Sequence, residues 1–173
     1  MKIFLNGYMG SGKSLIGKKL SESMDYPLVD MDDQIELMEG RSIHEIFQKK
    51  GELYFRKLEN QVLKDILAKN DNMIVSLGGG TPCYGNNFEL LKADENNKTV
   101  YLKASVEELT SRLFLEKVHR PVISHLDTKE QLEEFIRKHL FERAFYYNQS
   151  NIIVDVDGAT PTAIVEKIKS KLD

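Results

Sequence analysis

Residues 7–14, with the sequence GYMGSGKS, are the best suited to chemistry in this chain. The pattern Gly-x-x-x-x-Gly-Lys-Ser is typical of a phosphate-binding loop when a strand precedes it and a helix follows. Glycines let consecutive backbone N–H groups point inward around an anion, and the helix adds the positive end of its dipole. Lys13 then supplies charge to the β- and γ-phosphates of ATP, and the Ser14 hydroxyl binds Mg²⁺. A glycine turn that only caps a helix is the alternative, although a cap needs neither the lysine nor a third glycine.

An acidic cluster follows a short apolar run at residues 28–29. Residues two apart on an extended chain share a face, so Asp30 and Asp32 are expected to point together and Asp33 to point away. If this strand neighbours the first, the pair faces the γ-phosphate. Asp30 would then support Mg²⁺, and Asp32 would accept the proton of an attacking hydroxyl. The alternative is that these aspartates are N-caps of the following helix.

Arginine is scarce, with 6 arginines beside 18 lysines, so each arginine is a candidate for a bidentate contact with an anion. Arg143 falls on the apolar face of a helix predicted at 128–147, where an unpaired charge is costly, so we expect an anion to meet it. Arg56 lies near a helix start, three residues before Glu59, which can hold its guanidinium in place. An internal ion pair is the alternative for both. Arg137 is expected to face solvent.

Arg120 directly precedes Pro121, where a helix should stop. The segment joins two predicted helices, as a mobile lid over a phosphate site does, and could bring Arg120 onto the transferring phosphate. A plain surface loop is the alternative.

Gly78, Gly79 and Gly80 follow the most apolar of the short runs. Three glycines remove side chains where a ligand must approach the backbone closely, and their N–H groups could hold a carboxylate. A loose turn explains the pattern equally well.

The elements that must position these residues follow from the alternation of apolar runs and helical periods. Strands are predicted at 3–5, 28–29, 73–77, 99–102 and 152–156, and helices near 12–24, 31–39, 42–49, 52–69, 105–116, 128–147 and 160–172. Continuous apolar strands separated by helices indicate an α/β fold with a parallel sheet covered on both faces. Ligands bind at the carboxyl ends of such strands, where the phosphate loop, the aspartates and the glycines all lie.

Length, composition and charge limit the classes of function. With 173 residues, 41% of them hydrophobic and 29% charged, the chain suits one globular domain. A net charge of −3 without a basic cluster argues against a nucleic-acid partner. The single cysteine, Cys83, permits no intrachain disulfide and is expected to be a packing residue, and no apolar run approaches the roughly 20 residues that span a bilayer. We therefore expect a cytoplasmic protein with no membrane partner.

In this order, the motifs resemble those of the shikimate kinase family over nearly the whole chain. The family pattern begins with Gly-x-x-Gly-x-Gly-Lys-Ser at 7–14 and continues with Asp-x-Asp-x-x-Ile-Glu at 30–36. It goes on with Gly-x-Ser-Ile-x-x-Ile-Phe at 40–47, Gly-Glu-x-x-Phe-Arg-x-x-Glu at 51–59, Gly-Gly-Gly at 78–80, Arg-Pro at 120–121 and an arginine at 143. The ensemble is much more specific than any single motif.

The resemblance implies a fold and a reaction. The fold would be a single P-loop kinase domain, residues 1–173, with three layers and a five-stranded parallel sheet in the order 2-3-1-4-5. A substrate-binding region would lie at about 31–60 and a lid at about 112–126. The enzyme, a monomer, would use Mg²⁺ and transfer the γ-phosphoryl group of ATP to the 3-hydroxyl of shikimate.

The resemblance also implies roles for individual residues. Those that would contact ATP are Gly10, Ser11, Gly12, Lys13, Ser14, Leu15 and Arg120. Those that would contact shikimate are Asp32, Arg56, Gly78, Gly79, Gly80 and Arg143, with the two arginines gripping its carboxylate. Ser14 and Asp30 would serve the metal, and the catalytic residues would be Lys13, Asp32 as the base, and Arg120.

The chain departs from the family pattern in two places. Family lids usually carry extra basic or glycine residues before Arg-Pro-Leu-Leu, whereas this chain has residues 113–119 followed by Arg-Pro-Val-Ile. Many members also have an adenine-contacting arginine just before the proline of the last helix, where this chain has Ala159 and Thr160. Nucleotide grip and lid closure are therefore expected to differ, while the acceptor site is intact.

Two other classes of function compete with this interpretation. A gluconate-type or nucleoside kinase on the same scaffold would share the phosphate loop, but is not expected to combine Asp30-x-Asp32, Arg56 and the triple glycine. A non-catalytic nucleotide switch is less favoured. A guanine-binding motif would need an aspartate that residues 97–100 lack, and a degenerate module would have lost Lys13, Ser14 or Asp32.

Overall fold

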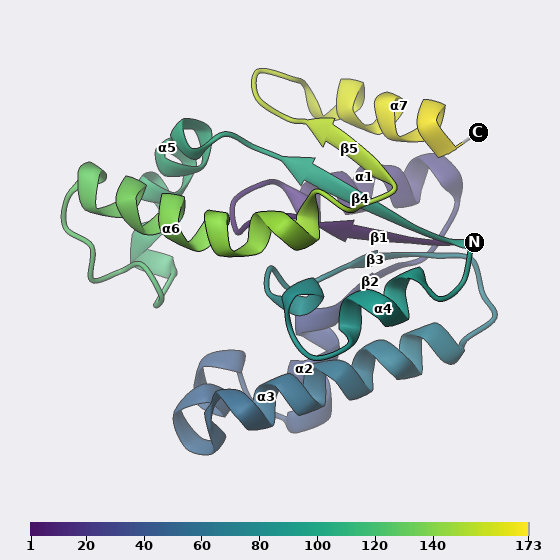
Figure 1. Ribbon diagram of the computed structural model, residues 1–173, viewed down its shortest axis with the longest axis horizontal. Coiled ribbons are helices and arrows are strands. Elements are labelled where there is room, and N and C mark those ends of the chain that lie inside the picture. The colour runs from purple at the N-terminus through teal and green to yellow at the C-terminus, as the bar shows by residue number, and fades with distance from the viewer. Residues whose placement is uncertain (173) are drawn as a thin grey trace.

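The computed structural model of the chain describes residues 1–172 and consists of a parallel sheet with helices on both faces (Figure 1). Its strands are β1 (Lys2–Asn6), β2 (Leu28–Asp30), β3 (Met73–Ser76), β4 (Asn97–Lys103) and β5 (Ile152–Asp155). They pair in parallel in the order β2-β3-β1-β4-β5, which confirms the expected topology. β3 therefore separates β2 from β1, so the condition that these two strands are neighbours is not met.

The helices connect the strands in the alternating manner that parallel pairing requires. They are α1 (Lys13–Met24), α2 (Met31–Glu39), α3 (Ile43–Ala68), α4 (Asn87–Lys92), α5 (Val106–Glu116), α6 (Lys129–Tyr147) and α7 (Pro161–Leu172). Two short 3₁₀ helices are also present, η1 (Thr81–Cys83) and η2 (Lys117–His119). Oxygen atoms of Ser105, Thr128 and Thr160 accept N–H groups at the starts of α5, α6 and α7, so side-chain caps fix where these helices begin.

The central strand β1 supplies residues to two hydrophobic cores, because its side chains alternate between its two faces. Ile3 and Leu5 enter a core with α1, α5, α6 and α7, whereas Phe4 enters a second core with α2, α3 and α4. All three side chains are completely buried. Since both faces are covered, neither face of β1 can be polar, which explains its continuous apolar sequence.

Two features differ from the sequence-based expectation. The helices predicted at 42–49 and 52–69 run into one another as α3, with a break in helical conformation at Gly51 (φ 80°, ψ 171°). The glycine permits this left-handed residue, so the chain turns there without an intervening loop. The short helix α4 was not predicted, because six residues are too few to establish a helical period.

The segments that carry the candidate residues gather beyond the carboxyl ends of the strands. In Figure 1, α5, most of α6, and α2 with the beginning of α3 lie on the side toward which the strand arrows point, away from both termini. Across residues 1–172, no helix has the length and apolar character that crossing a bilayer requires. The sheet thus provides one rigid edge at which the loops can build a site.

The second core makes a direct prediction about stability. Leu63 on α3 is completely buried, whereas Leu53 on the same helix is 72% exposed. Leu63→Ala should lower the free energy of unfolding by about 2–5 kcal/mol, because it removes buried methyl groups and leaves a cavity. Leu53→Ala, the matched control, should change it by less than about 0.5 kcal/mol. Urea denaturation of both variants measures the difference, and equal losses would contradict this description of the core.

Candidate active site

The phosphate loop occupies the turn between β1 and α1, in the context that its pattern requires. Gly7 has φ 148°, and a Cβ there would lie 2.7 Å from Ser11 Oγ and 2.9 Å from the Leu102 carbonyl oxygen, so a larger residue does not fit. Gly12 caps α1 in a left-handed conformation (φ 98°) without any side-chain acceptor. The first N–H groups of α1 are therefore left for a ligand, and an anion is the ligand that a helix N-terminus favours.

Lys13 is the first residue of α1, and its ammonium group folds back over the phosphate loop. Its Nζ donates to the carbonyl oxygens of Gly7 at 2.8 Å and Tyr8 at 3.2 Å. Burial lowers the pKa of Lys13 to about 8, although the nearby carboxylates of Asp32 and Asp30 oppose the shift. The protein alone therefore leaves this cation poorly solvated, and an arriving phosphate would supply the missing negative charge.

Asp30 is the N-cap of α2, so the alternative left open for it is correct. Its Oδ1 accepts from the backbone N–H groups of Asp32 at 2.9 Å and Asp33 at 3.4 Å. The prediction that Asp30 and Asp32 share the face of an extended strand is wrong, because β2 ends at Asp30 and the helix begins at Met31. Both carboxylates nevertheless line the same pocket, and Asp33 is exposed as expected.

The carboxyl group of Asp32 is strongly perturbed by its surroundings. Burial raises its pKa to about 6, and the negative charges of Asp30 and Glu59 act in the same direction, while Lys13 opposes them. A pKa this close to neutrality is typical of a group that exchanges a proton during a reaction.

Arg56 stands beside the triple glycine and is held from several sides. Its Nη1 donates to both carboxylate oxygens of Glu59 at 3.1 Å, and its guanidinium lies 3.7 Å from the centre of the Tyr84 ring. Glu59 is 1% exposed, so its carboxylate is buried beside the guanidinium that it was expected to hold. A Cβ on Gly80 would lie 2.8 Å from Arg56 Nη1, so this glycine makes room for the guanidinium. The internal ion pair therefore exists, and it fixes Arg56 at the edge of the site.

Arg143 approaches the same glycines from α6. Its Nη1 lies 3.1 Å from the position of a Cβ on Gly79, and its guanidinium carbon lies 5.9 Å from the centre of the Tyr8 ring. Among the described residues it forms no ion pair with a carboxylate, unlike Arg56 and unlike the exposed Arg137, which pairs with Glu133 at 2.6 Å. Within residues 1–172, Arg143 thus lies in the site without an anionic partner, whereas Arg41, which also has none, is exposed to solvent.

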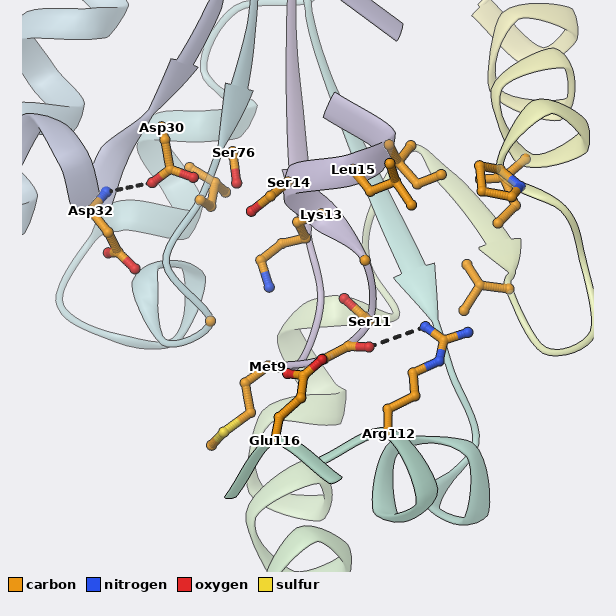
Figure 2. Close-up of a pocket in the computed structure, with 18 of the residues that line it drawn as sticks. Met9, Ser11, Lys13, Ser14, Leu15, Asp30, Asp32, Ser76, Arg112 and Glu116 are labelled. Atoms are coloured by element: carbon orange, nitrogen blue, oxygen red, sulfur yellow. Dashed lines mark hydrogen bonds between the residues drawn. The ribbon is translucent and has the colours of Figure 1, made fainter. Parts of the chain in front are cut away.

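The pocket between these elements has a volume of about 620 Å³. Figure 2 shows Asp30 and Asp32 on one side, Lys13 near the middle, and Arg112 with Glu116 across from the aspartates. Apolar residues complete the far end, which is lined by Val156, Ala159, Pro161 and Ile164. The pocket therefore offers cations and N–H groups to phosphates and an apolar surface beyond them, as a bound nucleotide requires.

Arg120, from the segment predicted to be a lid, lines this pocket and pairs with Glu116, through Nη2 at 2.7 Å and Nε at 3.0 Å from the same carboxylate oxygen. The sequence interpretation missed Arg112, whose Nη1 donates to the Gly10 carbonyl oxygen at 3.1 Å and whose Nε donates to Glu108 at 2.7 Å. A signal was present, because residues 108, 112, 116 and 120 alternate in charge at intervals of four, the spacing of neighbours on a helix.

The donor set of the site suits a magnesium ion bound together with phosphates. Ser14, Ser76 and Asp30 present hydroxyl and carboxylate oxygens to the pocket, and these hard donors are the ligands that Mg²⁺ prefers. Within residues 1–172, no group of three or more His, Cys, Asp or Glu side chains is arranged to hold a metal. A metal in this pocket would accordingly depend on ligands from a nucleotide, which is the usual arrangement for Mg²⁺.

Comparison with known proteins identifies the family. The family model described as shikimate kinase matches residues 9–173. A shikimate kinase of Flavobacterium johnsoniae is 48% identical over 167 residues, covering 96% of each chain. The crystal structure of the shikimate kinase of Bacteroides thetaiotaomicron superposes with a TM-score of 0.90 at 31% identity, covering 99% of this chain and 98% of the other.

A further solved structure is the shikimate kinase from Acinetobacter baumannii in complex with shikimate, with a TM-score of 0.85, 28% identity, and coverage of 99% of this chain and 92% of that one. The matches to these three proteins span nearly the full length of both partners. The chain belongs to the shikimate kinase family.

Proposed function

We propose that this chain transfers the γ-phosphoryl group of ATP to the 3-hydroxyl of shikimate, giving shikimate 3-phosphate and ADP, a step in the biosynthesis of chorismate and the aromatic amino acids. One observation carries the proposal: Lys13 and Asp32 line one pocket, while Arg56 and Arg143 meet the glycines at its edge. A phosphate loop alone would support any nucleotide-dependent enzyme. The pair of arginines around free glycine N–H groups adds a site for a small carboxylate.

The acceptor carboxylate would bind between Arg56, Arg143 and the backbone of Gly79. Arg56 is already fixed by Glu59, so little of its side-chain freedom remains to be lost on binding. Arg143 has no carboxylate partner among the described residues, and an acidic ligand would relieve its unbalanced charge. Two guanidinium groups from different helices would also fix the orientation of the ring.

Asp32 would orient the ring hydroxyl and accept its proton. The 3-hydroxyl oxygen attacks the γ-phosphorus. The bond between that phosphorus and the oxygen that bridges the β- and γ-phosphates breaks, and ADP leaves with the bonding electrons. The raised pKa of Asp32 makes its carboxylate a better proton acceptor than an ordinary aspartate. Lys13 and Arg120 would stabilise the negative charge that moves onto the β-phosphate oxygens.

Ser14 and Asp30 would hold Mg²⁺ when ATP is bound. Asp30 is suited to this because Oδ1 already accepts two N–H groups, which fixes its carboxylate and leaves Oδ2 for the pocket. Mg²⁺ in such a site neutralises charge on the phosphates.

Residues 31–60 would form the substrate-binding region and 112–126 the lid of this single domain. The lid brings Arg112 and Arg120 to the pocket edge, although its sequence departs from the family pattern. The family resemblance further leads us to propose a monomeric, cytoplasmic enzyme. The gluconate-type or nucleoside kinase stays the closest alternative, and the acceptor decides between them.

The proposed function is tested by the dependence of ADP formation on the acceptor. With Mg·ATP, shikimate should stimulate ADP release at least tenfold above the acceptor-free rate, because the arginine pair would hold its carboxylate so that the rigid ring presents the 3-hydroxyl to Asp32. Gluconate and nucleosides should leave the rate unchanged. A coupled assay for ADP over this panel gives the answer, and equal rates with and without shikimate would reject the assignment.

The role of Arg143 is tested by its truncation. Arg143→Ala should raise the KM for shikimate roughly 10- to 100-fold, because it removes hydrogen bonds between two charged groups. The KM for ATP should stay within about threefold, since the nucleotide binds through the phosphate loop. Arg137→Ala on the same helix is the matched control, because its exposed ion pair contributes little. Equal rises in both KM values would contradict the proposed contact with the carboxylate.

The two perturbed groups predict a bell-shaped pH profile. Asp32 must be ionised to accept a proton, so kcat/KM for shikimate should fall as the pH drops below its raised pKa of about 6. Lys13 must be charged to attract phosphate, so kcat/KM for ATP should fall as the pH rises above its lowered pKa of about 8. Initial rates between pH 5 and 9.5 measure both limbs. Asp32→Asn should abolish the acidic limb of its residual activity, and survival of that limb would assign it to another group.

A further inference from the structure

The turn formed by Gly78, Gly79 and Gly80 has no side chains of its own that could fix its backbone conformation. Glycine has more conformational freedom than any other residue, so three in succession need external contacts to keep one conformation. Each of the three carbonyl oxygens accepts one hydrogen bond. Gly78 accepts from Thr81 N at 3.0 Å and Gly80 from Cys83 N at 2.9 Å, both within the local turn.

The carbonyl of Gly79 is the exception, because its donor comes from a distant part of the chain. The hydroxyl of Tyr147, the last residue of α6, donates to it across a separation of 68 residues. Tyr147 is completely buried, and its ring lies against that of Tyr101 on β4, with centroids 5.0 Å apart. Burial raises the pKa of Tyr147 far above its ordinary value, so the hydroxyl keeps its proton and its role as a donor.

The N–H groups of the same glycines, unlike their carbonyl oxygens, have no hydrogen-bond partners among the described residues. None of them donates a hydrogen bond to another group within residues 1–172. Gly79 lies where three parts of the site meet, since a Cβ on it would be 3.1 Å from Arg143 Nη1 and 3.6 Å from the Gly7 carbonyl oxygen. The orientation of its peptide planes therefore decides whether free N–H groups point at the same ligand as Arg143.

We propose that Tyr147 is a positioning residue for the acceptor, which fixes the glycine turn through the Gly79 carbonyl so that its free N–H groups and Arg143 converge on the substrate carboxylate. The inference rests on the proposed function, because it takes the carboxylate of that substrate as the ligand. In this role Tyr147 would act through the glycine turn, since its hydroxyl is already engaged by the Gly79 carbonyl. It acts by tying the carboxyl end of β3 to α6, the helix that carries Arg143 one turn earlier.

A purely structural role for Tyr147 would produce a different result, and Tyr101 allows the two to be separated. The rings of these tyrosines pack together and both are buried, at 0% and 4% exposure. The hydroxyl of Tyr101, however, forms no hydrogen bond with any residue from 1 to 172. Removing either hydroxyl leaves the packed rings in place, but only Tyr147→Phe releases the glycine turn.

The experiment compares Tyr147→Phe, Tyr101→Phe and the unaltered enzyme in steady-state kinetics. Tyr147→Phe should raise the KM for shikimate roughly three- to tenfold, the effect of losing one hydrogen bond that orients the site. Its KM for ATP should stay within twofold, and Tyr101→Phe should leave both KM values within twofold. An unchanged KM for shikimate in Tyr147→Phe, equal rises for both substrates, or equal effects of the two variants would each overturn the proposal.

The same assay distinguishes failure of this inference from failure of the proposed function. If the unaltered enzyme shows no shikimate-dependent ADP release, the function is wrong and the inference falls with it. If the unaltered enzyme responds to shikimate and Tyr147→Phe behaves identically, only the inference is wrong.

A second measurement needs no variant and covers the case in which Tyr147→Phe does not fold. Hydrogen exchange of peptides spanning residues 77–83 is followed in the unaltered enzyme with and without saturating shikimate. Binding should slow exchange of the glycine amides, because free N–H groups acquire an acceptor. Unchanged exchange at saturation would mean that these groups do not bind the carboxylate, which would overturn the proposal.

Discussion

The parallel pairing of β1 with β3 is the constraint on which the site depends. Leu5 pairs with Ser76, and the N–H of Leu77 donates to the Leu5 carbonyl at 3.0 Å, so the two strands end at the same level. The phosphate loop follows β1 and the triple glycine follows β3. The pairing of the two strands is therefore enough to place these two loops side by side. A residue larger than glycine at position 7 would collide with Ser11 and the Leu102 carbonyl. The distance between the phosphate loop and the glycines proposed to bind the acceptor is thus set by the spacing of neighbouring strands.

The charged groups at the carboxyl edge of the sheet are poorly compensated in the free protein, and this favours the binding of charged ligands. Lys13 is desolvated, Asp32 retains its proton to higher pH than an ordinary aspartate, and Arg143 has no carboxylate partner among residues 1–172. Each condition costs stability in the free protein, because buried charge needs compensation. Bound phosphates and a bound carboxylate would supply it. The charged groups that destabilise the free protein would therefore contribute most to the binding of these ligands.

The sequence predicted the parts of the site that depend on local spacing. The phosphate loop is contiguous, and the placement of Arg143 and Glu59 follows from helical periodicity, so both could be found without the fold. The aspartates were placed in the correct pocket for an incorrect reason, because the chain turns into α2 one residue earlier than an extended strand would allow. Tyr147 escaped notice because an isolated tyrosine on an apolar face has no pattern. Its hydrogen bond to Gly79 depends on the way that α6 packs against the sheet, which no local spacing encodes.

The two halves of the site differ in how firmly they are held before any ligand binds. On the acceptor side, Glu59 is 1% exposed and binds Arg56 with both oxygens, and such buried, doubly hydrogen-bonded pairs leave little freedom. On the nucleotide side, Arg120 pairs with Glu116 while their side chains remain 36% and 52% exposed. Exposed pairs of this kind contribute about 0.2–1 kcal/mol, so Arg120 can exchange its carboxylate for phosphate at little cost. In the proposed function, the acceptor side would therefore be formed in advance and the proposed lid at 112–126 would adapt to the nucleotide, which would explain how an unusual lid sequence coexists with acceptor residues that keep the family pattern.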